Sequence, residues 1–176
     1  MLLRKINAII SLLTTVFLLD HAIFTSVWML SKGSVEQSAP FAPWILAGLM
    51  AAHAFISIYF AVSSHMDDEK IKCKSYPKMN RVTIFQRVSG ILLIAFAALH
   101  VAGAAEPLQP PPLVHTILPP FFFTVALAHA AVSTDRAFIT LGIGNARFIK
   151  VVGIITKVIC AATLVASVTG FYLYAW

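Results

Sequence analysis

Five apolar runs, each about 20 residues long, divide this sequence and constrain its fold more than any other feature. A segment inside lipid must satisfy all of its backbone N–H and C=O groups internally, so only helices or a closed β-barrel can span a membrane. The runs lack the alternation of polar and apolar residues that is typical of barrel strands. The sequence therefore predicts an all-α integral membrane bundle of five transmembrane helices, forming a single domain over residues 1–176.

The composition agrees with lipid as the solvent. Of the 176 residues, 59% are hydrophobic and 11% are charged, and the mean hydropathy is +0.86. A soluble fold of this size cannot bury so much apolar surface. The expected spans are Ile6–Met29, Phe41–Ser63, Val82–Gly103, Leu113–Ser133 and Phe148–Leu173.

Two of these spans have unusual features. The first follows Arg4 and Lys5, as a signal peptide would, but its length of about 24 residues and the lack of a small-x-small cleavage site favour a retained helix. The fourth contains Pro119 and Pro120, which we expect to bend it.

The distribution of Lys and Arg predicts the orientation. One side of the membrane receives Arg4, Lys5, Lys70, Lys72, Lys74, Lys78, Arg81, Arg87, Arg136, Arg147 and Lys150. The other side receives Lys32, and by the positive-inside rule the N-terminus is cytoplasmic and the C-terminus external. The net charge of +6 thus follows membrane topology and does not indicate a nucleic-acid-binding domain.

The cysteines offer little chemistry. Cys73 lies in a charged loop and Cys160 in the fifth span, so they form neither a disulfide framework nor a metal site. The sequence also lacks the C-x-x-C-H motif that attaches haem covalently.

Four successive spans each carry one histidine at depth: His21, His53, His100 and His129. An ionisable group inside a membrane is costly, so each is a candidate functional residue. With a rise of about 1.5 Å per residue, His21 and His100 fall in the outer half, His53 near the middle and His129 in the inner half. The spacing predicts an outer pair from the first and third spans and a looser inner pair from the second and fourth.

Paired imidazoles at two depths suit two stacked haems. A haem iron that transfers electrons takes two axial ligands from opposite sides, and neutral imidazole is a common choice. The alternative is that each histidine forms hydrogen bonds in helix packing or lines a substrate path. His65, in the polar loop after the second span, and His115, at the outer start of the fourth, are expected to be interfacial.

The segment Phe85–Gly90, Phe-Gln-Arg-Val-Ser-Gly, is followed by an apolar helix that reaches His100. It resembles the Gln-Arg-Val-(Thr/Ser)-Gly segment of the di-haem cytochrome b subunit that anchors succinate dehydrogenase and fumarate reductase. That family has five spans with ligand histidines on its first four. The resemblance covers nearly the whole chain, and the segment from Asp135 to Gly144 resembles the family's link into its fifth helix.

The resemblance implies two haem b groups, with His53 and His129 on the proximal iron and His21 and His100 on the distal iron. It also implies a quinone substrate, with menaquinone as the expected type. The partners would be an iron-sulfur subunit and an FAD-containing flavoprotein subunit on the cytoplasmic face of a bacterial inner membrane. Succinate oxidation and fumarate reduction share this anchor, so both directions stay open.

Three further residues are candidates for the haem pockets. Arg87 lies one turn inside its span and suits either a haem propionate or a positive-inside anchor. Ser89, with Gly90, permits close approach of a macrocycle or of a neighbouring helix. Lys157 is a charge within the fifth span; snorkelling and pairing with a propionate or quinone both remain open.

Quinone chemistry needs a proton-transferring group, for which Asp20 and Glu36 are the candidates. Asp20 lies in an apolar run beside His21 but points about 100° away around the helix. It suits quinone protonation or orientation of a histidine, and a helix–helix hydrogen bond is its alternative role. Glu36 lies in the first external loop, where simple solvation is the alternative. Leu127 stands where family members that couple protons across the membrane have Glu, so that proton route is not expected here.

Two other functions remain open from the sequence. One is a di-haem cytochrome b subunit of another membrane-bound dehydrogenase, such as a hydrogenase or a formate enzyme. The other is a haem-free transporter or membrane scaffold that uses its histidines for protons or packing.

Overall fold

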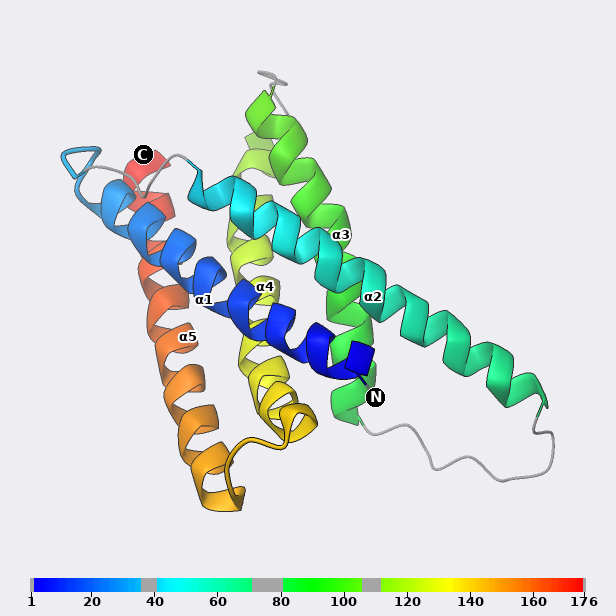
Figure 1. Ribbon diagram of the computed structural model, residues 1–176. Helices are drawn as coiled ribbons and strands as arrows, with labels where there is room; N and C mark the ends of the chain where they lie inside the picture. The colour runs from blue at the N-terminus through cyan, green and yellow to red at the C-terminus, as the bar shows by residue number, and fades with distance from the viewer. Residues whose placement is uncertain (1, 36–40, 71–80, 106–111, 176) are drawn as a thin grey trace.

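The computed structural model describes the backbone of residues 2–35, 41–70, 81–105 and 112–175, and side chains there except at positions 64–70, 102–105, 112–116 and 175. Its helices are α1 (Leu2–Leu30), α2 (Ala42–Lys70), α3 (Arg81–Ala105), α4 (Pro112–Leu141) and α5 (Ala146–Ala175) (Figure 1). Each contains a stretch long and apolar enough to cross a membrane. The chain is a multi-pass helical membrane protein, as its apolar runs predict.

All five helices extend past an end of their expected spans, α2 and α4 by the most. α2 continues to Lys70, so the prediction of a polar loop directly after Ser63, which includes His65, was wrong over residues 64–70. α4 continues through Pro119 and Pro120 to Leu141, so Asp135–Phe138 is helical and is not part of a link. Hydropathy marks where contact with lipid ends, whereas a helix satisfies its own backbone and can continue into water.

The turn between α4 and α5 is short and specified by its sequence. Gly142 adopts a left-handed φ of 71°, which costs glycine little. The N–H of Ile143 donates to the carbonyl of Phe138 at 3.2 Å, closing the end of α4. Asn145 then caps α5, because its Oδ1 accepts a hydrogen bond from the Phe148 N–H at 2.9 Å. α4 and α5 therefore pack as an antiparallel hairpin.

The tightest part of the bundle is where α1, α4 and α5 meet. Ser26 and Ser167 share a hydrogen bond of 2.8 Å between α1 and α5. A Cβ added to Gly170 would lie 3.2 Å from the Ser26 carbonyl, so this glycine allows the two backbones to approach. The buried cluster in this region is Leu127, Ala130, Ala131 and Cys160. Small side chains thus supply the close packing that lipid-embedded helices need.

Among the described residues, each of the other two helices packs closely against one neighbour. Within the described residues, α2 packs closely against α1, and α3 packs closely against α4. A hydrogen bond from Asn7 Nδ2 to Ser57 Oγ, at 3.3 Å, joins the first pair of helices. A hydrogen bond from Arg136 to Thr83 Oγ1, at 2.9 Å, joins the second. The four histidines lie on these four helices.

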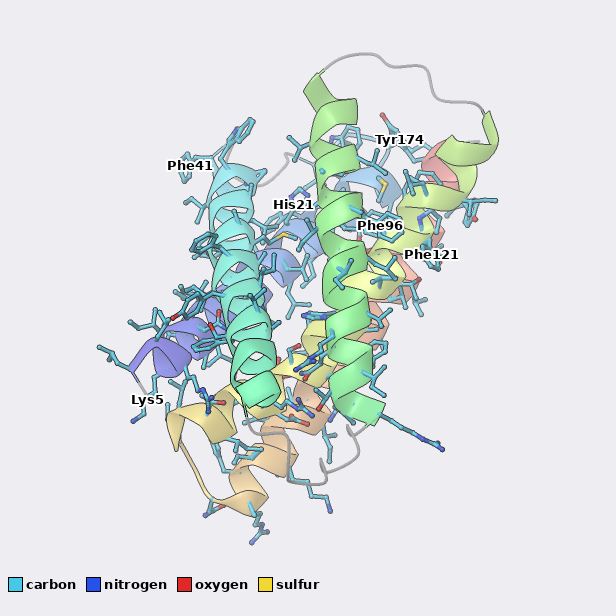
Figure 2. The ribbon with its side chains drawn as sticks, turned by 90° about the vertical axis from the view of Figure 1, so that its right-hand side faces the viewer. Lys5, His21, Phe41, Phe96, Phe121 and Tyr174 are labelled. Atoms are coloured by element: carbon cyan, nitrogen blue, oxygen red, sulfur yellow. The ribbon has the colours of Figure 1, made fainter. Side chains whose placement is uncertain are left out.

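The bundle has two distinct ends. The N-terminal end of α1 and the turn between α4 and α5 lie toward one end, while the C-terminal end of α5 lies at the other (Figure 1). Figure 2 shows Lys5 at the first of these ends and Phe41 and Tyr174 at the opposite one. We call the first the basic end, since Arg4, Arg136 and Arg147 lie near it. That the basic end faces the cytoplasm stays a prediction.

Candidate functional site

The four candidate histidines occupy one helix each. His21 is on α1, His53 on α2, His100 on α3 and His129 on α4. The side chains of His21, His53 and His129 are half-buried, and His100 is exposed. In Figure 2, His21 lies on the part of α1 that is seen between α2 and α3.

His21 and His100 form the first pair. They lie near enough for positive charge on one ring to repel positive charge on the other. The ring of His100 also lies 5.6 Å, centroid to centroid, from that of Phe122 on α4. Phe122 in turn belongs to an aromatic cluster with Phe96 and Phe121, whose rings are 5.4 Å apart and nearly perpendicular (Figure 2). Aromatic side chains therefore border this pair on the α3–α4 side.

His53 and His129 form the second pair, and they too interact electrostatically when charged. His53 also lies against the backbone of α1 at Asn7. The two pairs combine α1 with α3 and α2 with α4, which are the combinations that the depth argument gives. Whether they ligate iron stays a prediction.

His129 is the most firmly placed of the four rings. Its Nδ1 lies 2.7 Å from Ser89 Oγ on α3. A Cβ added to the neighbouring Gly90 would lie 3.6 Å from His129 Cε1, so the ring rests against the α3 backbone at ordinary van der Waals distance. Ser89 is only 3% exposed. The sequence identified Ser89 and Gly90 as a place of close approach, but it did not identify the ring that approaches.

Buried nitrogen atoms provide a test of whether these residues suit a metal-bound cofactor. Nδ1 of His21 and Nδ1 of His53 are buried and make no hydrogen bond within the described part of the chain. A buried polar atom without a partner is costly, and an ion or cofactor is one explanation for it. Each pair thus contains an imidazole with one ring nitrogen that no described residue satisfies, although His53 also contacts the Asn7 backbone. A metal ion bound at such a nitrogen would satisfy it, which fits ligation by histidines.

The described residues contain no group of three or more His, Cys, Asp or Glu side chains placed to hold a metal ion. This finding does not bear on haem, whose iron takes two axial ligands.

Arg87 is exposed on α3. It precedes Gly90 by three residues, so the two lie on the same side of the helix, with Arg87 one turn nearer the basic end. Gly90 faces His129, so Arg87 lies about one turn from the part of α3 that meets this ring; its binding of a haem propionate stays a prediction.

Of the two quinone-site candidates, the structure describes Asp20. Asp20 is half-buried, and its carboxylate attracts positive charge on His21. The two side chains therefore interact electrostatically although they are neighbours that point in different directions around α1. Glu36 lies outside the described residues.

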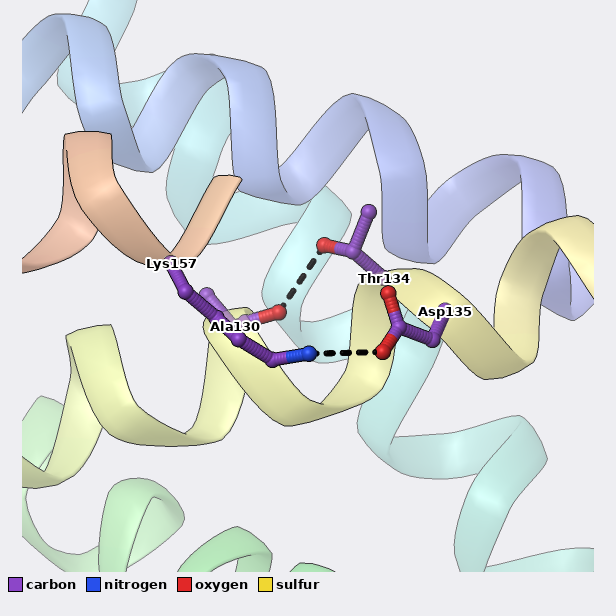
Figure 3. Close-up of polar contacts among 4 residues, drawn as sticks. All are labelled: Ala130, Thr134, Asp135 and Lys157. Carbon is purple, nitrogen blue, oxygen red and sulfur yellow. Dashed lines mark hydrogen bonds and ion pairs between the residues drawn. The ribbon is translucent and has the colours of Figure 1, made fainter. Parts of the chain in front are cut away.

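Lys157 has a partner that the sequence analysis missed. Its Nζ lies 2.8 Å from Asp135 Oδ2, joining α5 to α4 (Figure 3). Gly153, one turn before Lys157, faces the same carboxylate, and a Cβ there would collide with it. The charge of Lys157 is thus explained by an ion pair within the chain. The sequence contained only a weak signal, an acidic residue just after the expected fourth span and a basic residue inside the fifth, because their pairing depends on how the two helices pack.

Leu127 is 2% exposed and belongs to the buried cluster where α4 meets α5. Packing alone therefore accounts for an apolar residue at this position.

Comparison with protein-family models, curated proteins and solved structures found no significant match to this chain. The site must therefore be interpreted from its own geometry and from the resemblance of its motifs.

Proposed function

We propose that this chain is the di-haem cytochrome b membrane anchor of a succinate dehydrogenase or fumarate reductase complex. In this proposal it transfers electrons between a membrane quinone, menaquinone being the expected type, and an iron-sulfur subunit with its flavoprotein partner. The flavoprotein carries out the dicarboxylate chemistry. The complex lies in a bacterial inner membrane with the basic end of the bundle in the cytoplasm.

The observation that carries the proposal is the arrangement of the histidines. Four helices contribute one each, and the rings interact as two pairs, His21 with His100 and His53 with His129. Helix packing does not require ionisable rings to lie near each other in lipid, where charge on either one is costly. Ligation of one haem iron by each pair would explain why the histidines lie together in pairs.

The residues then have separate roles. His53 and His129 would hold the proximal iron, and His21 and His100 would hold the distal iron. When bound, each haem supplies a one-electron redox centre. Arg87 binds a propionate through its guanidinium fork. Asp20 and Glu36 are the candidate groups for exchanging protons with quinone near the distal pair.

The test is a dithionite-reduced minus oxidised absorption spectrum of the purified full chain. We expect a b-type α band and two haems per chain by pyridine haemochrome assay. A preparation that binds no haem after expression with ample haem supply would exclude this function and favour a haem-free transporter or scaffold. Mild purification of the complex then separates the cytochrome alternatives, since we expect an FAD-containing succinate-oxidising or fumarate-reducing subunit, not a hydrogenase or formate enzyme.

A further inference from the structure

The contacts of Ser89 determine how its single hydroxyl hydrogen is used. Ser89 Oγ lies 2.6 Å from the carbonyl oxygen of Phe85, one turn earlier in α3. It also lies 2.7 Å from His129 Nδ1. The carbonyl can only accept a hydrogen bond, whereas Nδ1 of a neutral imidazole either donates or accepts, depending on the tautomer.

Only one assignment of hydrogens satisfies both short contacts. If the hydroxyl donated to Nδ1, its oxygen would face the Phe85 carbonyl oxygen at 2.6 Å with no hydrogen between them. If it donates to the carbonyl, as serine commonly does within helices, its oxygen is free to accept from Nδ1–H. His129 then carries its proton on Nδ1, and the lone pair lies on Nε2.

We propose that Ser89 is a positioning residue that fixes His129 in the Nδ1–H tautomer and so directs the Nε2 lone pair to the proximal iron. The role in ligation rests on the proposed function; the tautomer does not. A hydrogen bond to the second ring nitrogen of a ligand histidine sets its tautomer and orientation and raises its basicity.

This arrangement distinguishes His129 from two of the other candidates. Nδ1 of His21 and Nδ1 of His53 lack a hydrogen-bond partner among the described residues. The hydroxyl and the adjacent Gly90 come from the same turn of α3, so one element both orients the ring and makes room for it. The proximal ligand on α4 is therefore prepared before any cofactor binds.

The first experiment needs no haem. In the haem-free full chain labelled with ¹⁵N-histidine, the signals of His129 are assigned by comparison with a His129→Gln variant. We expect wild-type His129 to show a protonated Nδ1 and an unprotonated Nε2. A proton found on Nε2 of the wild-type ring would overturn the proposal without recourse to any variant of Ser89.

Variants then test whether Ser89 is the cause. Ser89→Ala should shift His129 toward the Nε2–H form, while Ser89→Thr, which keeps the hydroxyl, should retain the wild-type tautomer. Ser167→Ala is the matched control, because it removes a buried hydroxyl that bonds to Ser26 and not to a histidine. An unchanged His129 tautomer in Ser89→Ala would show that the hydroxyl does not determine it.

The haem-loaded chain provides the second measurement. Ser89→Ala should raise the midpoint potential of one haem and leave the other unchanged, because a less basic imidazole stabilises the oxidised iron less. Affinity for that haem should fall about 10–100-fold, the usual cost of losing such a partner. Ser89→Thr should restore both quantities; equal potentials in all three proteins would refute the positioning role. Absence of haem from wild type would refute the proposed function but leave the tautomer result valid.

Discussion

A neutral histidine inside a membrane has two nitrogen atoms to satisfy, and the four candidates here differ in how they do so. Nδ1 of His129 forms a hydrogen bond with Ser89 Oγ, while Nδ1 of His21 and Nδ1 of His53 have no hydrogen-bond partner within the described residues. His100 is more exposed than the others and lies against Phe122. At the scale of single residues, the four rings therefore differ in their surroundings although the same role is proposed for each.

Removal of any one candidate ligand should cost one haem. His53→Ala and His129→Ala should each lose the proximal haem, and His21→Ala and His100→Ala the distal one, because an iron with one imidazole is no longer held from both sides. Pyridine haemochrome assays should therefore give one haem per chain where wild type gives two.

His65 provides a control for these variants, since we assign it to neither pair, and His65→Ala should keep both haems. If all four single variants retained two haems, the ligand assignment would be wrong.

The sequence specified the histidines but not their surroundings. Residue type and depth along a helix predict the pairs His21 with His100 and His53 with His129, and ligation by either pair stays a prediction. The Ser89–His129 contact depends on the rotation and register of α3 against α4, which packing sets and periodicity does not reveal. Lys157 appeared unpaired for the same reason, because Asp135 comes within 2.8 Å of it only once α4 and α5 form their hairpin.

At the scale of helices, apolar length located all five elements but misplaced some of their ends. α4 extends past Ser133 through Asp135 to Leu141, where the charges lower the hydropathy that the prediction used. Its end is instead set by Gly142, whose left-handed conformation stops the helix. Turn chemistry therefore gives a better boundary than hydropathy where a helix leaves the membrane.

The α4–α5 hairpin should be sensitive to a single methyl group at Gly153. Gly153→Ala would place Cβ against the Asp135 carboxylate, so this flexible side chain must move and its exposed ion pair with Lys157 is disturbed, at a cost of up to about 1 kcal/mol. The free energy of unfolding, measured by denaturant titration in detergent micelles, should fall by this amount. In the Asp135→Ala background the same change should cost much less, because the colliding group is gone.

Gly48 supplies the matched control for this prediction. A Cβ there meets nothing within 4 Å, so Gly48→Ala should leave stability unchanged or raise it by up to about 1 kcal/mol, since alanine favours helix. Equal losses at Gly48 and Gly153 would contradict the proposed collision.

At the scale of the whole molecule, three helices of the bundle pack closely together, and each of the other two packs closely against one neighbour among the described residues. α1, α4 and α5 pack against one another, whereas α2 packs closely against α1 and α3 against α4 within the described residues. Regions with fewer packed neighbours open more readily. A haem bound between the two histidines of each pair would link α3 to α1 and α2 to α4.

Amide hydrogen exchange in lipid nanodiscs should show this difference. In the haem-free chain, we expect α2 and α3 to exchange faster than the α4–α5 hairpin, and haem loading should slow exchange in α2 and α3 most. Uniform protection that haem does not alter would contradict a bridging role.

Orientation can be tested by cysteine labelling in intact cells. In a background with Cys73→Ser and Cys160→Ser, a membrane-impermeant maleimide should label Ser34→Cys from outside. It should label Asn145→Cys only after lysis, because the basic end is expected to face the cytoplasm. The reverse pattern would place the basic end outside and exclude cytoplasmic partners there.

The contact between α1 and α5 has a consequence for biosynthesis. α1 is synthesised before α5, so Ser26 can contact Ser167 and Gly170 only after α2, α3, α4 and α5 have followed it. Until then the face of α1 that carries Ser26 lacks the contacts with α5 that it has in the folded bundle. Synthesis of α5 therefore closes the bundle, and a ribosome that stalls before this helix would leave an insertion intermediate for membrane quality-control proteases to remove.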